Sequence, residues 1–149
     1  MPLPTIRPVR RSDRPQWQPL WEGYNTFYER VAAPDVTEAT WGRFFDHYEP
    51  MHAMVAERGD GQLIGLVHYI FHRNTFMIGP VTYLQDLFTS VDARGQGVGR
   101  ALINAVYAEA ERAGSPRVYW HTHETNAQAR VLYDKVAERS GFIQYRKAI

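Results

Sequence analysis

The sequence predicts a single domain of the α/β class, in either an α+β or a mixed α/β arrangement. Its 149 residues, 44% of them hydrophobic, are enough for one core, so residues 1–149 are expected to fold as one unit. Stretches with helical spacing of apolar residues alternate along the chain with short strand-like runs. The sequence contains no internal repeat and no low-complexity segment, which would have indicated another architecture.

The N-terminal segment is expected to form a short strand over residues 5–10, followed by a helical region over residues 12–31. Pro19 and Gly23 interrupt the helical pattern, because proline removes a backbone donor and glycine favours the unfolded backbone. The sequence therefore predicts breaks in the helix at these two positions.

A second helix is expected over residues 37–48, where apolar residues recur at helical spacing. Thr37 is its predicted N-cap, since a threonine hydroxyl can accept a hydrogen bond from a free N–H of the first turn. Two apolar runs then flank Gly59-Asp60-Gly61, which predicts a β-hairpin over residues 52–73.

The second half of the chain continues the alternation of strands and helices. Its expected elements are a strand over residues 81–89, a helix from near Gly97 to Gly114, a strand over 117–123, a helix over 126–141 and a final strand over 142–148.

Composition narrows the function classes. The chain has no cysteine, which removes disulfides, thiolate metal sites and a cysteine nucleophile and favours a cytoplasmic location. No run approaches the roughly 20 apolar residues of a membrane span, and the N-terminus lacks the apolar region of a secretion signal. We therefore expect a soluble protein with no membrane or nucleic-acid partner.

Charge is distributed unevenly, although the formal net charge is only +1. Residues 21–50 carry six acidic and two basic side chains, a net of −4, and residues 91–149 carry nine basic and six acidic ones, a net of +3. One part of the chain could receive a cation while the other holds an anion. Solvated faces would produce the same imbalance, so both interpretations stay open.

A cluster of glycines indicates an anion site. The stretch "RGQGVGR" from Arg94 to Arg100 has glycine at positions 95, 97 and 99, just before a predicted helix. Gly99 is followed by Arg100 and not by the Lys-Ser/Thr of a Walker loop, and the spacing does not fit a dinucleotide fingerprint. A pyrophosphate at the helix N-terminus fits what remains. The alternatives are a simple tight turn, or a different phosphate-binding enzyme.

The segment "YLQDLFTSVDARGQGVGRALINAVYAEAE" resembles motif A of the GNAT (Gcn5-related) N-acetyltransferases. The acetyl-CoA signature of that family, Arg/Gln-x-x-Gly-x-Gly/Ala, is matched by Arg94, Gly97 and Gly99. A second segment, "VYWHTHETNAQARVLYDKV", resembles the following strand and helix of the family. There Asn126 opens the helix and Tyr133 lies seven residues further on, as in the histone/polyamine-acetylating branch.

This resemblance implies a mixed, twisted sheet with helices on both faces and acetyl-CoA bound between the fourth and fifth strands. It implies direct transfer of the acetyl group to a primary amine, with an oxyanion held by backbone N–H groups at the end of the fourth strand. The residues implied in acetyl-CoA binding are Leu87, Phe88, Thr89, Arg94, Gly95, Gln96, Gly97, Val98, Gly99, Arg100, Asn126 and Tyr133.

Three residues are predicted to be catalytic. Tyr133 is the candidate general acid, because a phenol with a pKa near 10 stays protonated at neutral pH and can donate to the departing thiolate. Gln85 stands where relatives of the polyamine-acetylating branch commonly have an acid, and an amide cannot accept the proton directly. Asp86 supplies a neighbouring carboxylate, although alternation along a strand predicts that it points to the opposite face.

The general base therefore stays open at the level of sequence. It could be water held by Gln85, or one of four groups acting through water. These are Glu22, Tyr24, Tyr83 and His123.

A metal site is the less favoured interpretation of the histidines. His121 and His123 share one face of a predicted strand, and His68 and His72 are four residues apart, but no HExxH motif is present. We expect no bound metal. The aromatic residues of the first helical region are expected to belong to the core, although an acceptor-binding cage stays possible at its edge; they are Trp17, Trp21, Tyr24, Phe27 and Tyr28.

The acceptor is expected to be a cationic primary amine, either a small molecule or a peptide, if the acidic residues 21–50 line its cleft. A polyamine, a lysine side chain and an aminoglycoside all fit. The alternative is a domain that binds acetyl-CoA as a sensor or scaffold without turnover. A homodimer is expected from the resemblance and from aromatic residues near the C-terminal strands, namely Tyr119, Trp120, Phe142 and Tyr145.

Overall fold

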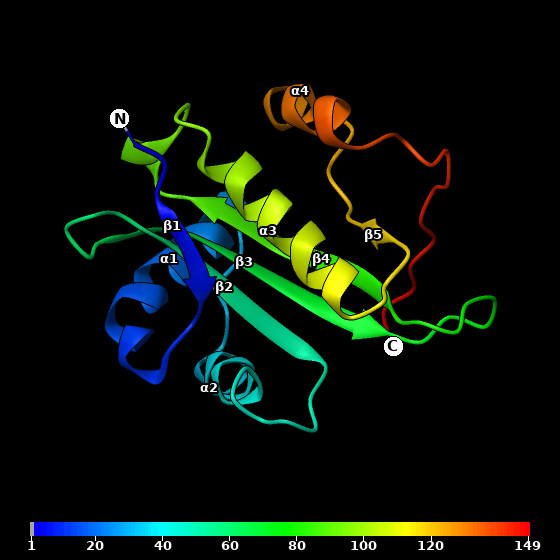
Figure 1. The fold of residues 1–149 in the computed structure, drawn as a ribbon, viewed down its shortest axis with the longest axis horizontal. Coiled ribbons are helices and arrows are strands. Elements are labelled where there is room, and N and C mark those ends of the chain that lie inside the picture. Colours follow the sequence, from blue (N-terminus) through cyan, green and yellow to red (C-terminus); the bar gives the residue numbers. More distant parts are fainter. Residues whose placement is uncertain (1) are drawn as a thin grey trace.

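The computed structural model describes residues 2–149, which form one sheet with helices on both of its faces (Figure 1). Within this range the sheet has five strands in the order β1-β2-β3-β4-β5. Neighbours run antiparallel from β1 to β4, and β5 runs parallel to β4, which confirms the predicted mixed sheet. The strands are β1 (Thr5–Pro8), β2 (Met51–Glu57), β3 (Leu63–His72), β4 (Val81–Thr89) and β5 (Val118–Tyr119).

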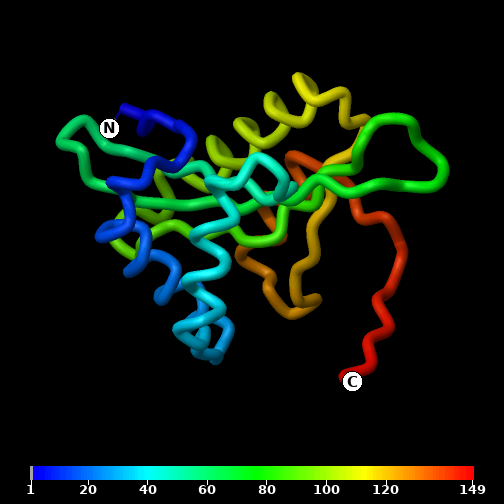
Figure 2. Tube along the Cα trace, turned by 90° about the horizontal axis from the view of Figure 1, so that it is seen from below, coloured from blue at the N-terminus to red at the C-terminus, as the bar shows by residue number. Residues whose placement is uncertain are grey.

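Helices cover the sheet on both sides, so the side chains of each face are buried in a separate core. The α-helices are α1 (Arg14–Phe27), α2 (Pro34–Arg43), α3 (Val98–Arg112) and α4 (Ala127–Val136), and short 3₁₀ turns occupy Arg11–Asp13 and Val91–Ala93. Figure 2 shows α1 and α3 on opposite sides of the sheet. The core on the α3 side is mainly aliphatic, with Tyr69 among its buried residues, and the core on the α1 side is built around three tryptophans. None of the helices within residues 2–149 has the length and apolar character that crossing a bilayer would require.

The breaks predicted in the first helix are wrong. α1 continues through Pro19 and Gly23, because Trp17, Leu20 and Tyr24 form a buried stripe along it and packing outweighs local propensity. Gly23 has a different purpose. A Cβ atom at this position would lie 2.9 Å from the ring of Phe88, so the glycine lets α1 approach β4 closely.

The second helix begins earlier than expected. Pro34 occupies its first turn, where a missing N–H costs nothing, and the chain leaves the helix after Arg43. Thr37 is therefore not the N-cap. It is buried inside α2, where its Oγ1 accepts a hydrogen bond of 3.0 Å from Trp21 Nε1.

The hairpin of β2 and β3 is confirmed. The strands pair antiparallel, and the turn is closed by a 2.9 Å hydrogen bond from Arg58 N–H to the carbonyl of Gln62. Gly61 adopts φ +85°, a left-handed conformation that explains the glycine there.

The C-terminal part differs most from the prediction. β5 contains two residues where seven were expected, α4 ends at Val136, and residues 142–148 form no strand within the described chain. The segment runs away from the sheet (Figure 2), with Phe142 91% and Tyr145 89% exposed. A strand needs a partner for its backbone groups, and within residues 2–149 this segment pairs with none.

Candidate functional site

The sheet opens between β4 and β5. These strands pair only at Thr82 with Val118 and at Tyr83 with Tyr119, and beyond Tyr83 they separate. The other edge of β4 stays paired with β3 as far as Thr89. In an antiparallel pair, alternate N–H groups point away from the partner strand, so such groups of residues 84–89 face the opening. This confirms the opening that the resemblance implied.

The glycine loop presents free backbone donors at the start of α3. Gly95 and Gly97 have φ values of +76° and +82°, and Gly97 is the N-cap of the 15-residue helix. The first helical hydrogen bond runs from Ala101 N–H to the carbonyl of Gly97. Within residues 2–149, the N–H groups of residues 95–100 have no protein acceptor. Six adjacent donors at a helix N-terminus fit a pyrophosphate, which is the diphosphate group of acetyl-CoA.

The side chains of the loop are mostly directed outward. Arg94 is exposed, and its guanidinium lies over the rings of Phe27 and Phe88 at 5.8 and 5.7 Å. Arg100 is also exposed, which leaves its charge available beside the helix N-terminus. Val98 is buried in the α3 core and anchors the glycine loop to that core.

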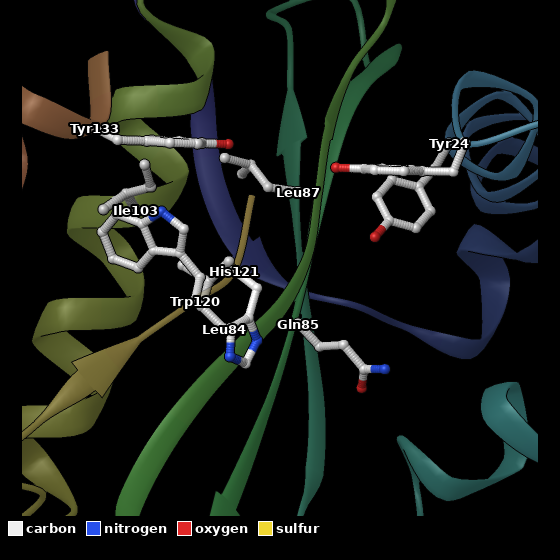
Figure 3. Close-up of a pocket in the computed structure, with 9 residues that line it drawn as sticks. Tyr24, Leu84, Gln85, Leu87, Ile103, Trp120, His121 and Tyr133 are labelled. Atoms are coloured by element: carbon white, nitrogen blue, oxygen red, sulfur yellow. The ribbon is translucent and has the colours of Figure 1, made fainter. Parts of the chain in front are cut away.

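A narrow pocket lies in the opening between β4 and β5 (Figure 3). Its cavity volume of about 20 Å³ is room for about one water molecule, so only reacting atoms would reach its floor. Its walls come from α1 and the residue that follows it, from β4, from α3 and α4, and from the two residues that follow β5. The lining residues are Tyr24, Tyr28, Leu84, Gln85, Leu87, Ile103, Trp120, His121 and Tyr133.

Tyr133 enters this pocket from α4. Its ring packs against Trp120 with centroids 5.4 Å apart, and in Figure 3 its hydroxyl points across Leu87 toward the α1 side of the pocket. Burial, with a smaller contribution from Tyr28, raises the pKa of Tyr133 to about 12. The phenol is therefore protonated throughout the neutral and mildly alkaline range, as a proton donor requires.

A β-bulge shapes β4 at the pocket. His68 pairs with Asp86 and Tyr69 pairs with Leu84, so Gln85 has no opposite residue on β3. Leu84 and Leu87 both belong to the α3 core, although strict alternation would place residues three apart on opposite faces.

Gln85 and Asp86 therefore both leave β4 on the α1 side. The predicted separation of these two side chains is wrong, because the bulge resets the alternation. Gln85 is exposed in the pocket and Asp86 is buried behind it.

Asp86 is held by His68, and His68 is held by Trp17; sequence reasoning placed neither of these two residues in the site. His68 Nδ1 lies 2.9 Å from Asp86 Oδ2, and Trp17 Nε1 lies 3.1 Å from His68 Nε2. All three side chains are buried. The signal available in the sequence was a histidine in the middle of an apolar strand, since a buried polar group requires a partner.

The same carboxylate faces the hydroxyl of Tyr24 on α1. Burial, followed by the charge of Asp86 and a hydrogen bond to it, raises the pKa of Tyr24 well above its usual range. Burial and Asp86 also raise the pKa of Tyr28. Arg30 lies over the rings of Tyr24 and Tyr28 at 5.5 and 5.6 Å, and its charge acts in the opposite direction.

Of the four candidate bases, only Tyr24 lines the pocket. Glu22 lies on α1 outside this pocket, and its carboxylate accepts a hydrogen bond from Gln18. Tyr83 faces His121 Nδ1 across 3.4 Å, and His123 packs on Tyr28 with centroids 6.2 Å apart.

Asn126 is also absent from the pocket. Its Nδ2 donates to Thr122 Oγ1 at 3.3 Å, so it braces the turn before α4. Tyr133 therefore lines the pocket, although Asn126 does not.

The histidines do not converge on one point. His68 is engaged by Trp17 and Asp86, whereas His72 Nε2 lies 2.8 Å from the hydroxyl of Tyr119. Across residues 2–149 no three His, Asp or Glu side chains are placed to share a metal ion.

A second, wider cleft of about 370 Å³ lies between α1 and α2. Two basic and two acidic residues line it, namely Arg14, Arg30, Glu22 and Glu38. The acidic residues of the segment 21–50 therefore lie outside the narrow pocket, and two of them reach this neighbouring cleft. Arg30 connects the sites, because it lines the cleft and covers two tyrosines of the pocket.

Comparison with known proteins agrees with this geometry. Residues 12–137 match the acetyltransferase (GNAT) family, a range that contains every lining residue of the pocket. The D-amino-acid N-acetyltransferase HPA3 of Saccharomyces cerevisiae (strain ATCC 204508 / S288c) is 34% identical over 143 residues, which cover 95% of this chain and 89% of that protein. The uncharacterized N-acetyltransferase YhfO of Bacillus subtilis (strain 168) is 28% identical over 142 residues, which are 94% of each chain. A crystal structure of a probable acetyltransferase superposes with a TM-score of 0.85 at 20% identity, covering 97% of both chains.

Proposed function

Because the chain belongs to the acetyltransferase (GNAT) family and is an acetyl-CoA-dependent N-acetyltransferase, we propose that it transfers the acetyl group directly to the primary amine of a small molecule bound beside Tyr24. The observation that carries this proposal is the position of the glycine loop. Its free N–H groups lie between β4 and α3, which both line the pocket, and a Cβ atom at Gly99 would lie 3.6 Å from Leu132, the neighbour of Tyr133 on α4.

The proposed roles follow from the groups at each end of this opening. The N–H groups of residues 95–100 hold the pyrophosphate, and the charge of Arg100 adds to the attraction. The unpaired N–H groups of β4 near Leu87 stabilise the oxyanion that forms when the amine attacks the thioester. Preorganised donors of this kind are worth roughly 3 kcal/mol each.

Tyr133 is the proposed general acid. The C–S bond breaks as the oxyanion collapses, and the thiolate takes a proton from the phenol. A pKa of about 12 keeps that proton on Tyr133 until the thiolate forms. Asn126 has no direct role in this scheme, because its side chain is bonded to Thr122.

The proposed acceptor is an amino acid. The relative HPA3 is named for D-amino acids, and such an acceptor has a carboxylate next to its amine. Arg30 is the cation beside the pocket, since its guanidinium covers Tyr24 and Tyr28 and has one hydrogen bond, from Nε to Asn25 Oδ1 at 2.8 Å. The remaining guanidinium donors are available for a carboxylate, which would place the amine over Tyr24.

A cationic amine is the second candidate, as expected from the histone/polyamine-acetylating branch. Glu22 and Glu38 in the cleft between α1 and α2 favour it, because a polyamine extending from the pocket would reach them. Arg30 and Arg14 line the same cleft and offset that charge, so we rank the amino acid first.

A panel of acceptors separates these candidates. Thiol release from acetyl-CoA is measured with D- and L-amino acids, a polyamine and a lysine peptide, for wild type and Arg30→Gln. An amino-acid acceptor predicts that Arg30→Gln raises KM about tenfold or more for amino acids and leaves or lowers KM for the polyamine. No thiol release with any amine, together with intact acetyl-CoA binding, would instead support the sensor or scaffold function.

We also propose a homodimer and a cytoplasmic location for this single domain of residues 1–149. The exposed apolar side chains of Phe142, Ile143 and Tyr145 support the dimer, because a second copy could cover them and supply the strand partner that residues 142–148 lack. The absence of cysteine supports the location.

A further inference from the structure

We propose that Trp17, His68 and Asp86 form a buried relay that ends on the hydroxyl of Tyr24, and that Tyr24 with Asp86 removes the proton from the acceptor ammonium. This proposal rests on the acetyl transfer proposed above. It assigns Tyr24 as a catalytic residue at the pocket and His68 as a positioning residue behind it.

The tautomer of His68 follows from its partners. Trp17 Nε1 can only donate, so His68 Nε2, at 3.1 Å, must accept and carries no proton. The ring proton therefore lies on Nδ1, which donates to Asp86 Oδ2 at 2.9 Å. Trp17 is 0% and His68 2% exposed, so neither nitrogen can exchange its partner for bulk water.

This arrangement leaves the remaining hydrogen-bond acceptor sites of the Asp86 carboxylate on the side of the pocket. The β4 bulge places Asp86 on the α1 side and His68 occupies one of its oxygens from β3, while Tyr24 on α1 lies close enough to the carboxylate for Asp86 to raise the pKa of the phenol. The other ionisable groups that face Asp86 are Tyr28 on α1 and Tyr83 on β4. Both are phenols, so neither brings a second charge next to the carboxylate.

A purely structural role explains this cluster poorly. His68 is surrounded by aromatic rings, with Trp21 at 5.5 Å and Phe44 at 4.8 Å between centroids. A buried polar group in such surroundings has a desolvation cost that its hydrogen bonds only offset, whereas an apolar side chain of similar size has none. The retained polar chain runs from Trp17 through His68 to Asp86, beside the buried tyrosine of the α1 core that lines the pocket, Tyr24.

The proton balance of the step is complete. The acceptor R–NH₃⁺ gives one proton to the Tyr24 oxygen while the Tyr24 proton moves to Asp86, and the free amine forms the N–C bond to the thioester carbonyl. When the C–S bond breaks, the thiolate takes the Tyr133 proton, and the second amine proton restores the Tyr133 hydroxyl through water. Asp86 returns its proton through Tyr24 to solvent after the product leaves, so one proton is released per amide formed.

The first test compares Tyr24→Phe with Tyr69→Phe. Tyr69 is an equally buried tyrosine of β3 that lies in the α3 core, away from the pocket. Tyr24→Phe is expected to lower kcat/KM about 10²-fold or more at pH 7, with acetyl-CoA affinity retained, and Tyr69→Phe to change it less than about threefold.

The pH profile separates a proton route from simple support of the fold. Without the relay only the free amine reacts, so kcat/KM of Tyr24→Phe should rise about tenfold per pH unit toward the amine pKa, which is about 10.4 for a lysine-type amine. Wild type should reach its plateau well below that pH. If Tyr24→Phe lowers kcat/KM by the same factor at every pH, so that its profile keeps the wild-type shape, the proposal is overturned.

His68 is tested by rescue. His68→Leu should reproduce the pH profile of Tyr24→Phe, and His68→Asn, whose amide nitrogen can replace Nδ1 as the donor to Asp86, should restore at least tenfold of the lost rate. Trp17→Phe removes the indole N–H but also replaces the buried bicyclic ring by a smaller phenyl ring, so denaturant unfolding must first show that the variant is folded. It should then shift the acidic limb of the profile.

The outcomes distinguish the two levels of the argument. If wild type releases no thiol with any amine, the proposed function fails. If wild type turns over and Tyr24→Phe matches it at every pH, only the relay fails.

Discussion

Removal of the Tyr133 hydroxyl is the most direct test of the proposed mechanism. Within residues 2–149 this hydroxyl has no hydrogen-bond partner, and the ring is held by its contact with Trp120 at 5.4 Å. Tyr133→Phe keeps the ring and its packing, so the free energy of unfolding should change by less than about 0.5 kcal/mol. Acetyl-CoA affinity should stay close to that of wild type.

The chemical step should slow markedly. General acid catalysis is typically worth about 10²- to 10⁴-fold, which corresponds to about 2.7 to 5.4 kcal/mol in the barrier. Because the pKa of Tyr133 is raised to about 12, the donor form persists to higher pH than in an ordinary tyrosine. Wild-type kcat should therefore show no loss from ionisation of Tyr133 up to about pH 10.

Tyr107 provides the matched control. Its hydroxyl donates to the carbonyl of Val136 at 2.8 Å and thus joins α3 to α4. Tyr107→Phe should lower the free energy of unfolding by about 1 kcal/mol with kcat near wild type, the reverse of the pattern for Tyr133→Phe. Steady-state thiol release, calorimetry with acetyl-CoA and denaturant unfolding measure the three quantities. A folded Tyr133→Phe variant with wild-type kcat would refute the role of Tyr133.

Three further predictions concern the loop, the dimer and the N-terminal ion pair. Gly97→Asp should abolish measurable acetyl-CoA binding, because it brings a negative charge and a side chain at φ +82° to the pyrophosphate site. Gly97→Ala brings only the side chain and should weaken binding moderately. If calorimetry gives the two variants equal affinities for acetyl-CoA, a charge effect is ruled out. Deletion of residues 142–149 should convert a dimer to a monomer in light scattering, and a monomeric wild-type chain at micromolar concentration would contradict the dimer. Asp13→Asn should cost about 1.5 to 3 kcal/mol at pH 7, because the buried Asp13 carboxylate forms a bidentate pair with Arg7. That pair lowers the pKa of Asp13, so the stabilisation is present above about pH 4 and is lost as the pH falls through the lowered value. If the difference in the free energy of unfolding between Asp13→Asn and wild type stays constant down to pH 2, the ion pair is not its cause.

The sequence by itself determined the features that depend on local physics. The glycine loop and α3 are such features. Glycines that adopt left-handed conformations form the loop, and the apolar residues at helical spacing that follow them form α3. The β2–β3 hairpin is equally local, because its turn and its two apolar runs are adjacent in the chain. The sequence also singled out Tyr133, from the resemblance of the motif around it; the structure places this residue in the pocket, and its catalytic role stays a prediction.

Only the tertiary structure decided which polar residues meet. His68 and Asp86 are 18 residues apart and pair through strand register, and Trp17 reaches His68 across 51 positions through the packing of α1. A single bulge at Gln85 turns Asp86 toward α1, and such a shift leaves no mark in the alternation of apolar residues. Residues 142–148 show the converse: the sequence predicts a strand there, but a strand forms only where its backbone groups find a partner, and within residues 2–149 this segment pairs with neither β1 nor β5, the edge strands of the sheet.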